Sequence, residues 1–341
     1  MMHKRVGRQT VLLEEPVHIL SHAAVGGKME SEGPLADYFD TLSADSFFGE
    51  KTWEKAESTM QRQALSKALE KATLGHGDLD YILSGDLLNQ CVGSAFSLRD
   101  SGIPFWGLYG ACSTMGESIA LGSLLIAGGF AQRVGAMTSS HFCTAERQYR
   151  MPVPYGSQRT PTAQWTATAA GCAILGREGR GPRITAVTCG KIVDKGIKDS
   201  NNMGAAMAPA AFDTLSAHFT ATGTAPGDYD LVVTGDLGVL GHEIVTDLFA
   251  RQGVDMGKNY TDCGLLLFDV KQQDMHAGAS GCGCAASVLC GYLLRQMEEG
   301  KWKKILFAPT GALLSPTTTC QGESIPGISH AVTIEMDGRN E

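Results

Sequence analysis

The sequence predicts an α/β protein folded as two similar halves, and two observations carry that prediction. First, the segment 77–87 returns 150 positions later as 227–237, with six of eleven residues identical. Second, a Gly-Cys loop followed by a stretch of helical character occurs once in each half, at 110–113 and at 281–284. A matched order of elements at a fixed separation is typical of a duplicated domain. We therefore expect a layered αβαβα fold with two pseudo-symmetric halves.

In the first half, an amphipathic stretch at 56–72 predicts a helix. The short apolar run inside 77–87 predicts a buried strand that ends at a Gly-Asp bend. The loop at 110–113 leads into a predicted helix at 114–127, which is followed by an apolar strand at 134–138. Strands that alternate with helices favour a parallel or mixed sheet covered by helices.

The second half repeats this order. Its predicted helix, strand, Gly-Cys loop, helix and strand lie at 206–221, 227–237, 281–284, 285–298 and 305–308. A Gly-Arg-Pro stretch at 177–183 predicts a turn between the halves. We divide the chain there into 1–180 and 181–341.

The charge and the apolar stretches of the sequence indicate which kinds of binding partner and location to expect. The net charge is -8 and no run of five basic residues occurs, whereas binding to nucleic acid needs clustered Lys and Arg. Residues 1–16 have no apolar core of a signal peptide, and the longest apolar stretch, 119–131, is too short to cross a bilayer. We expect a protein made in the cytosol that binds no nucleic acid and whose contact with any membrane is peripheral.

The cysteines predict reduced thiols and no metal centre. Ten cysteines in a large chain without an export signal are expected to stay unpaired. Cys282 and Cys284 form a CxC pair with no partner CxxC, whereas a structural zinc site takes four ligands at regular spacings. We expect neither a metal ion nor a cofactor.

The two Gly-Cys loops place Cys112 and Cys282 at predicted helix N-termini, where free N–H groups and a partial positive charge favour anions. In pseudo-symmetric halves these ends face one cavity, with Ser280 beside the second loop. Such a cavity suits a carboxylate or an oxyanion. The pKa of a thiol falls at a helix N-terminus, so Cys112 is a candidate thiolate. The sequence agrees equally well with a buried, unreactive Cys112.

A segment rich in hydrogen-bonding groups, 138–150, follows the strand at 134–138. Ligands of α/β proteins bind in the loops that follow strands. Ser140, His141 and Arg147 are therefore candidate ligand contacts, and the guanidinium of Arg147 matches a carboxylate. A surface ion pair for Arg147 and a structural role for His141 are equally open. The stretch 152–168 predicts a long loop over the site or at a subunit contact.

Seven segments together resemble the thiolase superfamily and, within it, the stage V sporulation protein AD family of spore-forming bacteria. They span nearly the whole chain, at 85–90, 110–114, 138–141, 144–148, 207–211, 262–265 and 310–316. The resemblance implies a protein that binds dipicolinic acid (pyridine-2,6-dicarboxylate), alone or as its calcium chelate. It also implies a homodimer at the spore inner membrane. There it acts with other stage V sporulation A membrane proteins in dipicolinate uptake during sporulation and release at germination.

The resemblance to condensing enzymes of the superfamily extends to Cys112, which matches their nucleophile, but not to the other catalytic groups. The condensing enzymes also use two His or Asn residues from their second half. Gly235 occupies the first of these positions and Met275 the second, with His276 one residue later. The segment 309–312 lacks the cysteine of thiolases. Condensation needs a base as well as a nucleophile. We therefore expect a binding protein and no enzyme.

Two alternatives remain open from the sequence. One is a thioester-dependent acyltransferase or condensing enzyme with Cys112 as nucleophile and His276 or His242 as base. The other is a scaffold for a membrane complex with a vestigial pocket.

Overall fold

The computed structural model describes residues 4–149 and 158–337. Its first half contributes five strands to the central sheet. They are, in spatial order, β5 (Phe105–Gly107), β4 (Tyr81–Gly85), β6 (Arg133–Ser140), β8 (Ala169–Gly176) and β2 (Thr10–Gly26). The second half contributes β11 (Tyr260–Asp262), β10 (Leu231–Gly235), β13 (Lys304–Ala312), β15 (Ala331–Met336) and β9 (Pro182–Thr188).

Both sets of strands pair in the same pattern. In the first half β5 and β6 are parallel to β4, and β8 is antiparallel to β6 and to β2. In the second half β11 and β13 are parallel to β10, and β15 is antiparallel to β13 and to β9. The prediction of a duplicated fold is confirmed by this topology.

The halves share one continuous sheet because β2 and β9 pair antiparallel. The predicted boundary at 177–183 is the turn that links β8 to the start of β9. Since hydrogen bonds cross this boundary, the division at residue 180 stays a prediction.

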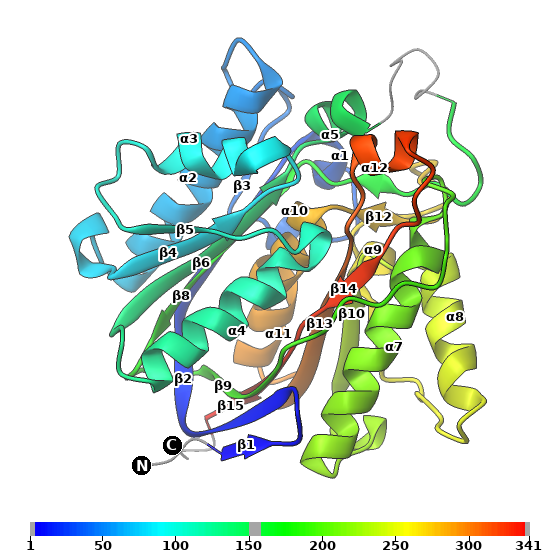
Figure 1. Cartoon of the computed structure of the whole chain (residues 1–341). Coiled ribbons are helices and arrows are strands. Elements are labelled where there is room, and N and C mark those ends of the chain that lie inside the picture. The colour runs from blue at the N-terminus through cyan, green and yellow to red at the C-terminus, as the bar shows by residue number, and fades with distance from the viewer. Residues whose placement is uncertain (1–3, 150–157, 338–341) are drawn as a thin grey trace.

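Helices form the remaining layers (Figure 1). On the outside lie α2 (Trp53–Ala72), α3 (Val92–Leu98), α7 (Met203–Thr222) and α8 (Gly238–Ala250). Two central helices start at the Gly-Cys loops: α4 (Thr114–Ala127), and α10 (Cys282–Ser287), which continues through a π-helical turn (Val288–Leu293) into α11 (Leu294–Glu298). α4 packs on β6 and on β13, whereas α10 packs on β6 and β8, so each central helix contacts strands of the other half.

The long outer helices show why the repeat folds as it does. α2 begins at Thr52, whose hydroxyl accepts a hydrogen bond from the Lys55 N–H at 3.4 Å. Its buried residues Met60, Ala64 and Ala68 recur every four positions and so line one helix face against the sheet. α7 begins at an Asn202 cap and ends at Gly223, which has a φ of 68°.

The other elements are short. They are β1 (Lys4–Val6), α1 (Lys28–Ser31), β3 (Thr41–Leu42), α5 (Phe142–Tyr149), β7 (Trp165–Thr166), α9 (Cys263–Leu266), β12 (Ala279–Ser280), α12 (Pro316–Cys320) and β14 (Gly327–Ser329), with 3₁₀ turns at Ala36–Tyr38, His76–Asp78, Asn89–Cys91, Ala111–Ser113 and Pro226–Asp228. None of the helices in the two described ranges is long and apolar enough to cross a bilayer.

Residues 152–168 are predicted to form a loop. The structure describes 158–168 of this stretch, and 152–157 lie outside the described residues. Within the described part, β7 pairs parallel with β12. This pairing holds the loop against the residues that precede the second Gly-Cys loop.

Candidate functional site

The two Gly-Cys loops meet at the interface of the halves. The Cys282 thiol donates a hydrogen bond to the Ala111 carbonyl at 3.0 Å. Gly311 of β13 packs on the first loop so closely that a Cβ there would lie 2.2 Å from the Gly110 carbonyl oxygen. The prediction that Cys112 and Cys282 approach each other is therefore confirmed: both side chains belong to one buried cluster.

A pocket opens where the loops meet. Both halves line it, with Leu87, Tyr109, Cys112, Ala145, Glu146, Tyr149, Gln164 and Thr166 from the first and Ser200, Asn201, Met203, Ser280, Ala312 and Leu314 from the second. Its volume is about 60 Å³, which is room for a few water molecules. A pocket of this size has little room for a long acyl chain.

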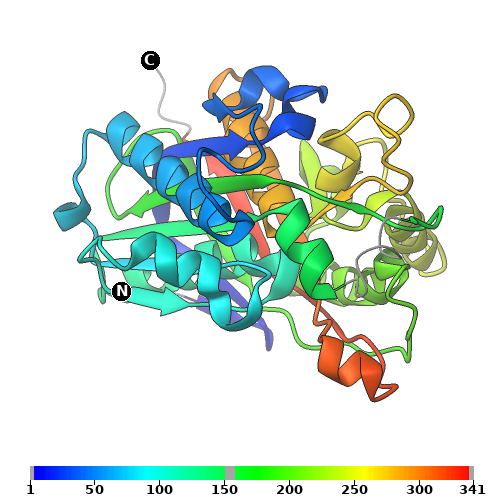
Figure 2. The ribbon, with the colours of Figure 1, turned by 90° about the horizontal axis from the view of Figure 1, so that it is seen from above.

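Two tyrosines stand between this pocket and an outer hollow. The hydroxyls of Tyr109 and Tyr149 are 3.1 Å apart, and the Tyr149 hydroxyl donates to the Leu87 carbonyl at 2.5 Å. Both tyrosines also line the outer hollow, which lies between α5 and α12 at the upper end of the molecule (Figures 1 and 2). Burial raises the pKa of Tyr109 to about 12 and that of Tyr149 further, so both hydroxyls keep their protons at neutral pH.

Cys112 lines the pocket with 7% of its surface exposed. Burial raises the pKa of its thiol well above the usual range, and the Asp236 carboxylate adds to that effect. The N–H groups of Gly281 and Cys112 act in the opposite direction and are outweighed. The structure therefore favours the protonated, unreactive alternative for Cys112, because burial exceeds the helix N-terminal effect.

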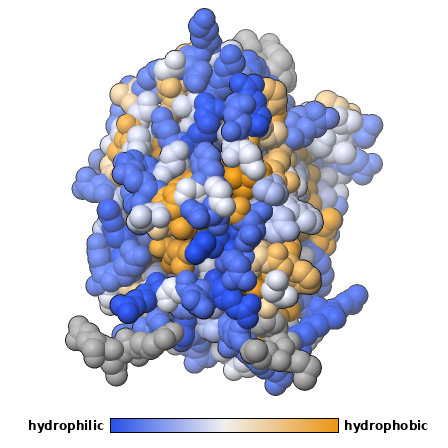
Figure 3. Space-filling model, turned by 90° about the vertical axis from the view of Figure 1, so that its left-hand side faces the viewer, coloured by the Kyte–Doolittle hydropathy of each residue, from blue (hydrophilic) through white to orange (hydrophobic). Residues whose placement is uncertain are grey.

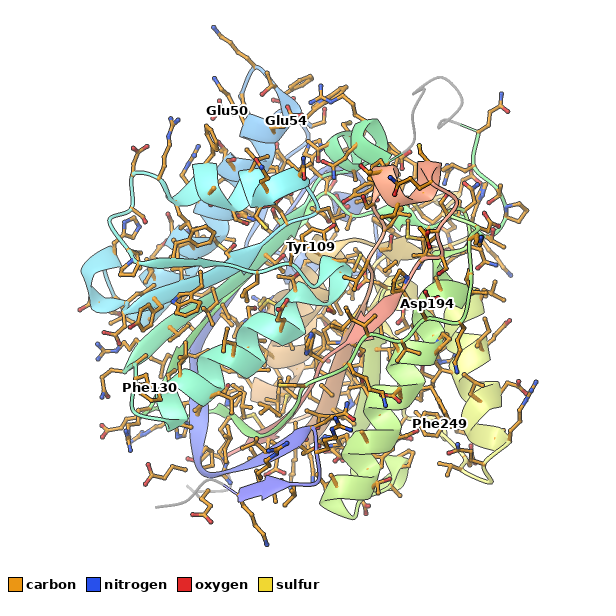
Figure 4. The ribbon with its side chains drawn as sticks, in the orientation of Figure 1. Glu50, Glu54, Tyr109, Phe130, Asp194 and Phe249 are labelled. Carbon is orange, nitrogen blue, oxygen red and sulfur yellow. The ribbon has the colours of Figure 1, made fainter. Side chains whose placement is uncertain are left out.

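Arg147, a predicted carboxylate contact, is placed outside the pocket. Its guanidinium forms an ion pair with Glu54 and lies 5.5 Å from the centroid of the Trp53 ring. Figure 4 shows Glu54 near the start of α2, well away from Tyr109 at the pocket. The physical reason is helix phase: Ala145 and Tyr149 are four residues apart and face the pocket, whereas Arg147, between them, faces away.

Ser140 and His141 also lie outside the pocket lining. The Ser140 hydroxyl donates to the Ala167 carbonyl at 2.7 Å and accepts from the Gly283 N–H at 3.0 Å, which ties the first half to α10. A His141 ring nitrogen lies 2.7 Å from the Ser46 carbonyl, and burial lowers the pKa of this histidine. Both residues hold the walls of the site together. Of the six predicted contacts, Cys112 and Ser280 line the pocket, and Cys282 lies directly behind it.

The candidate bases are absent from the described pocket lining. A Cβ on Gly235 would lie 2.9 Å from the Ala285 Cβ, so this position has no room for a side chain. Met275 is buried in the core. A ring nitrogen of His276 lies 2.6 Å from the Thr160 carbonyl, and the His242 ring stacks on Tyr260 at 4.4 Å. None of these residues faces Cys112.

Sequence reasoning missed three features of this site. Tyr109 and Tyr149 place linked hydroxyls in the pocket lining, and the Gln164 amide nitrogen donates to the Asp236 and Ala279 carbonyls. Asp236 follows Gly235 directly, is fully buried, and is one of the groups that raise the pKa of Cys112, after burial. The Gly-Asp bend of the repeat was the available signal for Asp236, and the four-residue spacing from Ala145 was the signal for Tyr149.

Comparison with known proteins places the chain by family. A family model described as stage V sporulation protein AD matches residues 7–335. The chain belongs to the stage V sporulation protein AD family. It is 43% identical over 335 residues to stage V sporulation protein AD of Bacillus subtilis, covering 98% of this chain and 99% of that one. The resemblance seen in the sequence is confirmed, and the chain is a sporulation protein of this family.

Solved structures show the same fold. The human mitochondrial 3-ketoacyl-CoA thiolase, in complex with CoA, has a TM-score of 0.61 at 12% identity and covers 96% of this chain and 99% of its own. The 3-oxoacyl-[acyl-carrier-protein] synthase III of Aquifex aeolicus has a TM-score of 0.55 at 15% identity, covering 94% and 99%. The thiolase-like fold class predicted from the sequence is thereby confirmed; at such low identity the likeness concerns the fold alone.

Proposed function

We propose that this sporulation protein binds dipicolinate without catalysis, in the pocket between its halves. In this proposal it acts with other stage V sporulation A membrane proteins, peripherally at the spore inner membrane. It takes part in dipicolinate uptake during sporulation and in release at germination. The observation that carries the proposal is a small pocket between the halves, lined by neutral hydroxyl groups, in which the cysteine is a buried thiol.

The donors around the pocket come from both halves. Hydroxyls of Tyr109, Tyr149, Thr166 and Ser280 lie in its lining. The N–H groups of Cys112 and Gly281 face the Cys112 sulfur at the two loops. A planar dicarboxylate has acceptor oxygens at two ends, which suits donors that converge from two sides.

Charge favours the calcium chelate as the bound form. Glu146 is the charged side chain among the described lining residues, and no Lys, Arg or His is found among them. A free dianion would therefore rely on helix N-termini and neutral groups among the described lining residues. Calcium dipicolinate has no net charge, so it needs no cation in the lining.

Calorimetric titration tests the proposal. Purified protein is titrated with dipicolinate, with and without calcium, and with benzoate as the control. We expect saturable binding at about one site per chain, tighter with calcium and absent for benzoate. The variant Tyr149→Phe, which removes one rim hydroxyl, should weaken binding by about 0.5 to 1.5 kcal/mol. Failure of the wild-type protein to bind either form would contradict the proposal.

The acyl-transfer alternative has one observation in its favour: Cys112 lies at a helix start in a fold shared with thiolases. Incubation with acyl thioesters, followed by mass spectrometry, distinguishes the two functions. We expect no acylated Cys112. Stoichiometric acylation would instead assign the pocket to an enzyme.

We also propose that the chain forms a homodimer through β5. This strand is the edge of the sheet, and Phe96, Phe105 and Trp106 beside it are 51%, 37% and 50% exposed. The face that carries β4, β5 and α3 shows apolar side chains gathered near its centre (Figure 3). An unpaired edge strand is a template for pairing with a second chain.

Sedimentation analysis tests the dimer. We expect the wild-type protein to sediment as a dimer and Trp106→Asp as a monomer. Ile192→Asp is the matched control, because Ile192 is 63% exposed but lies in the second half, away from β5. A wild-type monomer, or a dimer that Trp106→Asp leaves intact, would contradict the assignment of this interface.

A further inference from the structure

The pocket between the halves and the outer hollow share one wall. Tyr109, Tyr149 and Leu314 line both spaces. The volume of the pocket is about 60 Å³ and that of the outer hollow about 290 Å³. Because benzene occupies an engineered protein cavity of about 150 Å³, the pocket alone is too small for a substituted ring. A ring compound therefore fits only if the wall between the two spaces moves.

Tyr149 is the fixed part of this wall. It lies on α5, and its ring packs on the buried cluster that contains Cys112 and Cys282. Its hydroxyl donates to the Leu87 carbonyl at 2.5 Å. Because that bond uses the hydroxyl hydrogen of Tyr149, the Tyr109 hydroxyl is the donor in the 3.1 Å bond between the two tyrosines.

Tyr109 is the part of the wall that can move. It lies between β5 and the first Gly-Cys loop, close to the start of α4, and 44% of its surface is exposed (Figure 4). The backbone on either side is held, because the Leu108 N–H donates to a β4 carbonyl at 2.9 Å and the Gly110 N–H to the Thr114 hydroxyl at 3.1 Å. Once the bond to Tyr149 breaks, the ring turns about its side-chain torsions without movement of the loop. Such rotamer changes of exposed side chains take picoseconds to nanoseconds.

The outer hollow offers a neutral and firmly built approach to this wall. The Gln148 amide nitrogen donates to the Leu87 carbonyl at 3.0 Å, and its oxygen accepts from the Asn89 N–H at 3.0 Å. A dicarboxylate or its calcium chelate meets no charged side chain among the described lining residues. Apart from the three shared residues, these are Asn89, Gln90, Cys91, Gln148, Leu313, Ser315 and Pro316.

We infer that the outer hollow is the entrance to the pocket and that the ring of Tyr109 is its gate, closed on the Tyr149 hydroxyl. When the ring turns away, the two spaces join and admit a ring compound. When it returns, the two tyrosines separate the ligand from the hollow. Tyr109 thus sets the size of the solutes that pass. The inference deepens the proposed function and rests on it for the identity of the ligand.

Thiol labelling tests the gate without dipicolinate, because Cys112 lines the pocket behind it. Benzyl methanethiosulfonate is the probe: the thiolate sulfur bonds to the benzylthio sulfur, and methanesulfinate leaves. Peptide mass spectrometry follows the rate at Cys112, with the exposed Cys320 of the same molecules as the reference.

We expect Tyr109→Ala to raise the Cys112 rate at least about tenfold, because minor conformational states are populated at about 0.1 to 10% and the variant needs no opening. Met203→Ala is the matched control. Met203 also lines the pocket but not the outer hollow, so its truncation widens the pocket and leaves the gate in place. Its Cys112 rate should stay within about twofold of the wild type, as the hydrogen bond of the gate is kept.

Tyr109→Phe keeps the ring and loses the bond to Tyr149, and it serves as the second variant if Tyr109→Ala fails to fold. Its Cys112 rate should rise about two- to tenfold, in line with the loss of one neutral hydrogen bond. Equal rises in Tyr109→Ala and Met203→Ala would overturn the inference, because pocket width would then limit entry. So would a wild-type rate in the folded Tyr109 variants.

The entrance is tested by blocking it. Ser315 lines the outer hollow, whereas Thr317, two residues later on α12, is exposed and lines neither space. Added to Tyr109→Ala, Ser315→Trp should remove most of the gain at Cys112, and Thr317→Trp should leave it. A gain that survives both tryptophans would overturn the entrance.

Dipicolinate titration of the same samples separates the gate from the proposed function. Gated labelling of Cys112 in protein that binds no dipicolinate would support the gate and contradict the proposed ligand. Dipicolinate binding together with a Cys112 rate that ignores Tyr109 would do the reverse.

Discussion

Both halves contain the same Gly-Asp bend, but the aspartates of the two bends differ in their hydrogen bonds. In the first half Asp86 accepts three hydrogen bonds, one from the Leu88 N–H in the loop after β4 and two from Ser94 of α3. In the second half Asp262 holds the loop after β10, and Asp236 is left without an ordinary hydrogen bond. Each half thus fixes the backbone after its Gly-Asp bend with a different buried acid, Asp86 in the first half and Asp262 in the second, whereas Asp236 has no exposed surface and is not among the pocket-lining residues. Of four predictions, the first and third compare the halves directly, whereas the second and fourth concern Glu57 and Arg147 of the first half.

The largest effect is expected from Asp86→Asn. The amide presents a donor where the Ser94 N–H and hydroxyl need an acceptor, so the folded state should lose about 2 to 4 kcal/mol of unfolding free energy. Asp236→Asn should lose less than about 1 kcal/mol, or gain stability, because no ordinary hydrogen bond is broken. Urea denaturation of both variants measures the contrast, and equal losses would remove it.

A second effect concerns pH. Burial and the charge of Asp86 raise the pKa of Glu57 from its usual 4.5 to about 8. The folded state therefore holds a proton that the unfolded state releases. The resulting stabilisation is complete below pH 4.5 and is lost as pH rises toward 8, by about 1.4 kcal/mol per unit. Between pH 5.5 and 7.5 the wild-type protein should lose about 2 to 3 kcal/mol more unfolding free energy than Glu57→Gln loses. Urea unfolding at each pH measures this difference. A wild-type slope retained in the variant would contradict this assignment.

Substitution of the two loop cysteines should affect different properties, stability for Cys282 and ligand binding for Cys112. Cys282→Ala removes a fully buried thiol and its hydrogen bond to Ala111, so we expect a loss of about 1 to 2 kcal/mol of unfolding free energy. Cys112→Ala should cost less than about 1 kcal/mol but weaken dipicolinate binding, because this thiol lines the pocket. Denaturation and calorimetry on the same samples separate the two effects. The pocket assignment fails if Cys112→Ala binds like the wild type.

The smallest effect is expected at Arg147. Its ion pair with Glu54 is half-exposed, and such pairs contribute about 0 to 1 kcal/mol. Arg147→Ala should bind dipicolinate like the wild-type protein in the calorimeter. Binding weakened more than about threefold would restore Arg147 to the pocket, where the sequence had first placed it.

The sequence predicted what periodicity and repetition encode. The duplicated order of helix, strand and Gly-Cys loop is a pattern along the chain, and the pairing of β4 with β10 as equivalent strands follows from it. The meeting of Cys112 and Cys282 follows from the pseudo-symmetry. Ser280 lies in the pocket lining because it precedes the second loop by one residue, and its contact with a ligand stays a prediction.

Such patterns do not predict the directions in which side chains point. Arg147 lies in the right segment but on the wrong face of α5, because each helical residue turns by about 100°. The repeat pairs Asp236 with Asp86, but it does not show that Asp236 adopts a φ of 72° or that its carboxyl lacks the hydrogen bonds of its counterpart. The protonation of Cys112 depends on burial, which a sequence pattern does not measure.

The long strand β2 has a consequence for how the chain is made. Thr10 of β2 meets Thr188 of β9 through their hydroxyls, 178 positions later in the chain. At a ribosomal speed of about 5 to 20 residues per second, β2 waits about 9 to 36 s for this partner. Until then this 17-residue strand has β1, β3 and α2 as neighbours, and its long antiparallel pairings with β8 and β9 are missing. Much of the start of the chain thus lacks its main strand partners during synthesis, and the sheet closes only when the second half begins to emerge.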